Sequence, residues 1–169
     1  ILFKPGTRFY HINRLMIGFG FLFLGLDYMK TSVESFSQNF NPGQFQNMAL
    51  WMCLLIGTVI TALMQASAAT IAITLAALNS GLMTFEMAAA MVIGANIGTT
   101  ATVLLGAIGG SPPKKRVAGS HLAFNLVTGI IAFAALPAMV MIVKMFIDIT
   151  VNGPVGLALF HTIFNITGV

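Results

Sequence analysis

Two short polar stretches interrupt the apolar part of this chain: QASAAT at 65–70 and GANIGTT at 94–100. Their carboxamide and hydroxyl side chains are Gln65, Ser67, Thr70, Asn96, Thr99 and Thr100. Oxygen atoms of this kind are ligands for a hard cation such as Na⁺. If each stretch breaks a helix, the N–H groups that start the next helical segment favour an anion. Both stretches are therefore candidate ion-binding sites.

The chain has no basic residue between Lys30 and Lys114. An anion bound in this region would have to be held by helix N-termini, hydroxyl groups and a co-bound cation. The residues therefore predict Na⁺-coupled anion transport, with Na⁺ as the coupling ion rather than a prosthetic cofactor.

A structural interpretation of the polar stretches remains open. Ser and Thr can bond to their own helix, Gly and Ala can bring helices together, and Asn and Gln can bridge neighbours. The chain would then be a structural or assembly subunit of a membrane complex. An intramembrane enzyme is not predicted, because Ser67 lacks an evident base and His121 and His161 lie in no metal-ligand or Ser/His/Asp motif.

Composition places the chain in a membrane. Of its 169 residues, 57% are hydrophobic and 7% are charged, whereas soluble domains carry roughly a quarter charged residues. The apolar runs are long enough for spanning helices and lack the alternation of barrel strands, so we predict an all-α integral membrane protein. The net charge of +4 comes from basic residues at the edges of apolar runs, which excludes nucleic acid as an expected partner.

The apolar runs and turn signals divide the chain into a series of elements. Polar residues at 31–47 are predicted to form an interfacial loop between the first and second elements. Residue 1 is Ile, and no signal peptide is recognisable after it, so we expect the chain to begin inside a longer protein. The predicted elements are a flank (1–14), a span (15–29), a re-entrant hairpin (48–78, tip 65–70), a broken helix (83–108), a basic loop (109–116), a span (117–143) and the start of an incomplete further segment (148–169).

The distribution of basic residues predicts the orientation. If 48–78 returns to the side it entered from, one face of the membrane carries Lys4, Arg8, Arg14, Lys114, Lys115 and Arg116. Only Lys30 and Lys144 lie on the other face, so the flank and the 109–116 loop are predicted to be cytoplasmic in a multi-pass protein of the cell membrane. Three spans and a hairpin make one half of an inverted-repeat transporter.

A second group of polar residues follows the two stretches. The sequence HLAFN at 121–125 recurs as HTIFN at 161–165, which gives His121, Asn125, His161 and Asn165 matching spacing. These residues and Glu86 are candidates for lining a permeation path. The alternatives are hydrogen bonds across the bundle and, for Glu86, a carboxylate that complements the N-terminus of its own helix.

The motifs TALMQASAAT and VIGANIGTT, with SHLAFN and FHTIFN after them, resemble the sodium-dependent phosphate symporter family, the type II Na⁺/phosphate cotransporters and their bacterial relatives. The resemblance covers most of the chain from about residue 15. That family carries a Gln-Ser motif and a Gly-Ala-Asn-Ile-Gly-Thr-Thr-like break in each of two inverted repeats. This chain holds one repeat, in which Ala66 and Ala68 replace two serines of the fuller motif.

The resemblance implies partners and site residues. Sodium and inorganic phosphate would be the transported ions, in contact with the six polar side chains of the two stretches. The opposite half of the site would come from a second repeat of the parent chain or from a second copy of this one, in a setting of membrane lipid. A Na⁺-coupled transporter of another anion remains the alternative.

Overall fold

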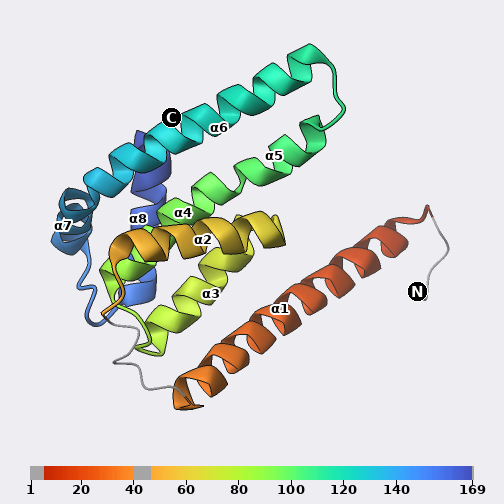
Figure 1. Cartoon of the computed structure of the whole chain (residues 1–169). Coiled ribbons are helices and arrows are strands. Elements are labelled where there is room, and N and C mark those ends of the chain that lie inside the picture. The colour runs from red at the N-terminus through yellow and green to blue at the C-terminus, as the bar shows by residue number, and fades with distance from the viewer. Residues whose placement is uncertain (1–5, 40–46, 169) are drawn as a thin grey trace.

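The computed structural model describes residues 6–39 and 47–168, and in these ranges it consists of helices with no strand (Figure 1). The helices are α1 (Arg8–Asn39), α2 (Leu50–Met64), α3 (Ser67–Asn79), α4 (Phe85–Gly98), α5 (Thr100–Ala107), α6 (Pro112–Ala134), α7 (Leu136–Phe146) and α8 (Gly153–Thr167). The predicted all-α fold class is confirmed.

Three helical segments are long and apolar enough to cross a membrane: Arg8–Ser35, Phe85–Ala107 and Pro112–Ala134. They overlap the three spans expected from the sequence. The two helices of the predicted hairpin, Leu50–Met64 and Ser67–Asn79, are apolar and shorter. Their return to one side of the membrane stays a prediction.

Helix α1 is longer than the predicted first span. It starts at Arg8, inside the expected flank, and runs to Asn39, through residues expected to form a loop. Residues 31–39 contain neither Gly nor Pro, and Lys30 and Glu34 form an ion pair of 3.8 Å one turn apart, so nothing stops the helix there. Residues 1–5 of the flank and 40–46 of the loop lie outside the described residues.

The helix boundaries in the second half of the chain differ from the predicted ones, and prolines are the reason. Residues 112–116 were expected in a loop, but Pro112 opens α6, because proline fits the first turn of a helix, where its missing N–H is not needed. The predicted span 117–143 is two helices that meet at Ala135. Pro137 supplies the reason, since it cannot donate to a carbonyl in the preceding turn and its ring crowds that turn.

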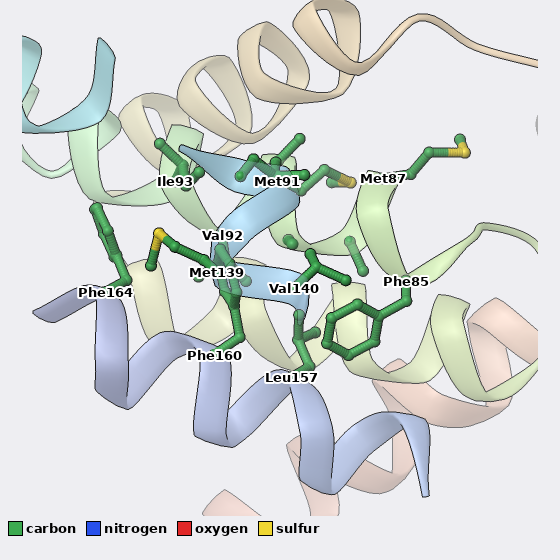
Figure 2. Close-up of a cluster of buried hydrophobic side chains, with 14 of the residues drawn as sticks. Phe85, Met87, Met91, Val92, Ile93, Met139, Val140, Leu157, Phe160 and Phe164 are labelled. Atoms are coloured by element: carbon green, nitrogen blue, oxygen red, sulfur yellow. The ribbon is translucent and has the colours of Figure 1, made fainter. Parts of the chain in front are cut away.

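Helix α4 forms the centre of the molecule. Ala88, Ala89, Ala90 and Ile93 are completely buried, which is expected of a helix that is apolar on all sides. Helices α2, α3, α6, α7 and α8 all contact it. Figure 2 shows the core on one of its faces, where side chains of α4 meet those of α7 and α8, among them Met139, Val140, Leu157, Phe160 and Phe164.

Glycines allow α2 and α4 to cross with their backbones in contact. A Cβ atom on Gly94 would collide with the Leu54 carbonyl oxygen, and one on Gly57 would collide with the Met91 carbonyl oxygen. A Cβ on Gly98 would lie 2.7 Å from the Thr61 Cβ. Close approach through small residues is how helices associate in a membrane, where lipid is as apolar as a leucine side chain.

We expect Gly94→Ala to lower the free energy of unfolding by about 1–3 kcal/mol, because the added methyl group meets backbone atoms that cannot turn away. The measurement is unfolding by sodium dodecyl sulfate in mixed micelles. The matched control is Gly119→Ala on α6, where a Cβ meets no atom within 4 Å. The control should gain up to about 1 kcal/mol from helix propensity. Equal effects of the two substitutions would contradict the contact.

Candidate functional site

The turn between α2 and α3 has an unusual backbone. Only Gln65 and Ala66 lie between the two helices. Gln65 adopts the left-handed conformation, with φ 54° and ψ 27°, and among the described residues no other non-glycine has a positive φ. This conformation costs a residue with a side chain about 1–2 kcal/mol. The observed turn is therefore shorter than the predicted tip at 65–70, and Ser67 and Thr70 lie in the first turn of α3.

Buried threonine hydroxyls hold this turn together. The Thr61 hydroxyl on α2 donates to the Thr70 hydroxyl on α3 at 2.7 Å, and the Thr74 hydroxyl donates to the Thr70 carbonyl at 2.8 Å. The Gln65 N–H donates to the Thr61 carbonyl at 2.7 Å. All three threonines are buried, whereas Gln65 is exposed and Ser67 is half-buried.

The GANIGTT stretch does not break its helix in the way predicted. Helix α4 ends at Gly98 and α5 starts at Thr100, but Thr99 between them keeps helical angles, φ −61° and ψ −25°. The Thr99 hydroxyl donates to the Asn96 carbonyl at 2.6 Å, and the Thr100 hydroxyl donates to the Ile97 carbonyl at 2.7 Å. Gly94 lies inside α4 and Gly98 is its last residue, so the interruption falls at Thr99 alone, and both glycines lie at the contact with α2.

Thr61 joins the two polar stretches. It bonds to Thr70 on one side, and Gly98 packs against it on the other. Thr61 was not among the site residues predicted from the sequence. The available signal was the spacing of Thr58, Thr61 and Gln65, which places three polar residues on or near one face of an otherwise apolar helix.

Asn96 belongs to a different face of α4. Its position is two residues from Gly94 and from Gly98, so it points away from α2. The Asn96 Nδ2 atom donates to the Asn125 Oδ1 atom on α6 at 2.7 Å. The six predicted residues therefore do not form one cluster: Gln65, Ser67 and Thr70 gather at the turn, and Asn96 lies across α4 from it.

A polar cavity of about 210 Å³ lies beside Asn96, between α4, α6 and the end of α8. Its lining includes the predicted pathway residues His121, Asn125 and Asn165. Asn125 also donates from Nδ2 to the His121 carbonyl at 2.9 Å. The Nδ1 atom of His121 is buried and has no hydrogen-bond partner among the described residues.

The other two predicted pathway residues do not line this cavity. The carboxylate of Glu86, in the first turn of α4, lies 3.4 Å from the Lys144 Nζ atom in the last turn of α7. His161 is half-buried on α8, and its carbonyl accepts a hydrogen bond from Asn165 Nδ2 at 2.7 Å. The Glu86 ion pair joins α4 to α7, whereas the His161 contact is made by its backbone carbonyl within α8.

Comparison with known proteins identifies relatives of this chain. A family model described as "Na+/Pi-cotransporter" matches residues 44–162, which include both polar stretches and the cavity residues His121 and Asn125. An "Uncharacterized protein YqeW" of Bacillus subtilis (strain 168) is 37% identical over 76 residues, which are 45% of this chain and 25% of that protein. The match thus spans about a quarter of the length of this curated relative. No solved structure matches.

The Thr61 to Thr70 hydrogen bond should show energetic coupling. We expect Thr61→Val and Thr70→Val each to lower the free energy of unfolding by about 1–3 kcal/mol, because each leaves the other buried hydroxyl without its hydrogen-bond partner. The double variant should lose less than the sum, since both partners are then apolar. Thr162→Val on α8 is the control, because its exposed hydroxyl bonds only to its own helix. Strictly additive single effects would show that the bond does not form.

Proposed function

The chain belongs to the Na⁺/Pi-cotransporter family, and we propose on this basis that it is part of a membrane protein that carries inorganic phosphate together with Na⁺. The family is one of transporters, so an enzyme is not proposed.

The observation that carries the proposal is the strained, exposed turn at Gln65. A left-handed non-glycine residue is retained where the surrounding structure holds it in place, and such residues gather at functional sites. The turn also puts the C-terminal carbonyls of α2 next to the N-terminal N–H groups of α3. One end favours a cation and the other favours an anion, which suits a site that binds Na⁺ and phosphate together.

At this turn, Gln65 and Ser67 would supply accessible oxygen atoms, with Thr70 beneath them. In the second stretch, the hydroxyls of Thr99 and Thr100 donate to carbonyls of their own helix. A hydroxyl that donates its proton keeps its lone pairs, so these oxygens remain able to coordinate a cation. Asn96 would bind from the opposite side of α4.

The polar cavity would form part of the permeation path. His121, Asn125 and Asn165 bring polar groups to a space between helices that are otherwise apolar. Among the described residues, no three His, Cys, Asp or Glu side chains lie together in a metal-binding group. A cation passing through the described part of the chain would therefore meet carboxamide, hydroxyl and carbonyl oxygens.

We further propose the topology of an inverted-repeat half, completed by a second repeat of the parent chain or by a second copy. Helices α1 and α6 both start toward the right-hand side of Figure 1. Their basic starts, with Arg8 and Arg14 on one helix and Lys114 to Arg116 on the other, therefore lie toward the same side. The proposal assigns that side to the cytoplasm, in agreement with the positive-inside rule.

Specific contacts favour a second candidate function, that of a structural subunit whose polar residues only hold the helices together. The bond between Asn96 and Asn125 and the hydroxyl bonds of Thr99 and Thr100 are the contacts that such a structural subunit would use. A Na⁺-coupled transporter of another anion is also compatible with the turn, since Ala66 and Ala68 bring no hydroxyl to it.

We expect Gln65→Ala and Asn96→Ala each to reduce Na⁺-driven phosphate accumulation about tenfold or more, because each removes an oxygen that contacts a charged species. The measurement is uptake of radiolabelled phosphate into proteoliposomes that hold the full-length protein, with and without a Na⁺ gradient. Gln38→Ala is the matched control, since Gln38 is an exposed residue near the end of α1.

The outcomes separate the candidates. Loss of uptake in both variants, with folded protein in each case and a normal control, supports Na⁺/phosphate transport that depends on both polar stretches. Normal uptake in both variants would favour the locking role for the polar residues. Absence of gradient-driven phosphate flux from well-folded wild-type protein would overturn phosphate as the substrate, and the same assay with sulfate would then test another anion.

A further inference from the structure

An open groove of about 480 Å³ lies between the end of α5 and the start of α6. Its walls are Val103, Gly106, Ala107, Pro113, Lys114 and Val117. Five of these residues are apolar, and Lys114 is the charged one. The groove therefore combines an apolar surface with one cationic group.

The loop at 108–111 creates this groove by bringing the two helices side by side (Figure 1). Gly106 leaves the groove open, because a Cβ on it would meet no atom within 4 Å. A Cβ on Gly110 would lie 3.2 Å from Lys114 Cδ, so the aliphatic part of Lys114 packs against the loop backbone. A lysine can cover apolar surface in this way and keep its charged end free for an anion.

The groove also lies at a defined depth. The candidate span Phe85–Ala107 ends at it, and the candidate span Pro112–Ala134 begins at it. The ends of spanning helices meet the headgroup layer of a bilayer. The apolar walls therefore extend toward the hydrocarbon layer, and the basic residues lie at the level of the headgroups.

Among the described residues, no acidic side chain forms an ion pair with the basic residues at this end of the molecule. Three consecutive basic residues at the start of α6 are exposed to solvent: Lys114, Lys115 and Arg116. Within residues 6–39 and 47–168, the ion pairs are Lys30 with Glu34 and Lys144 with Glu86. Neither pair involves the three basic residues, so their charge is available to an external anion.

We propose that this groove binds an anionic phospholipid, with an acyl chain against Val103, Gly106 and Val117 and the headgroup phosphate at Lys114. Lys115 and Arg116 add long-range attraction. A soluble anion would leave the apolar walls uncovered, and a neutral lipid would leave the three cations uncompensated. Basic pockets between spanning helices recognise anionic headgroups in this manner.

The experiment measures lipid binding to the full-length protein in detergent by native mass spectrometry, with dioleoylphosphatidylglycerol and dioleoylphosphatidylcholine as probes. We expect preferential binding of the phosphatidylglycerol. Lys114→Gln should weaken that binding about fivefold, the effect of one lysine near an anionic surface. Lys30→Gln makes the same charge change near the opposite end of a span and should leave the binding unchanged.

Gly106→Leu tests the apolar part of the groove. It fills open space on an exposed part of α5, so the fold should tolerate it, and it should weaken phosphatidylglycerol binding about as much as Lys114→Gln. Equal binding of the two lipids, or an unchanged affinity in both variants, would overturn the proposal. Competition by soluble glycerol phosphate at the affinity of the lipid would also overturn it, because the site would then recognise a free anion.

Discussion

The contact between the backbones of α2 and α4 is the constraint on which the rest of the structure depends. In a membrane, helices gain little from burying apolar side chains, because lipid already surrounds those side chains with apolar groups. Packing must therefore come from close approach, and Gly57, Gly94 and Gly98 allow it. The crossing places α4 at the centre, and the other helices that contact α4 are arranged around it.

The same crossing positions the polar groups. Since Gly98 packs against Thr61, and Thr61 bonds to Thr70, the turn at Gln65 is connected to α4 through one side chain. A left-handed Gln65 would relax in an isolated peptide, where nothing opposes the change. Here the hydrogen bond between the buried hydroxyls of Thr61 and Thr70 stabilises the turn, because moving α3 away from α2 would break this bond in a place that water does not reach.

Composition and hydropathy were sufficient to predict the all-α class and the three candidate spans, because each depends on long runs of one residue type. They were not sufficient for the GANIGTT stretch. Glycines four residues apart can open a helix or let another helix approach, and only the position of Leu54 against Gly94 decides between these roles. The bend at Pro137 was missed because apolar residues on both sides concealed it, and Thr61 was missed because its importance arises from contacts with Gly98 and Thr70.

The near absence of charge between Glu34 and Lys114, where Glu86 is the exception, has a consequence for the proposed transport. Burying an unpaired charge in a membrane is expensive, whereas carboxamides and hydroxyls can bond to each other or to the backbone when no ion is present. Asn96 bonds to Asn125, and Thr61 bonds to Thr70, in this way. A site made of neutral groups can therefore exist empty at little cost, and the charges of Na⁺ and phosphate offset each other when both ions bind.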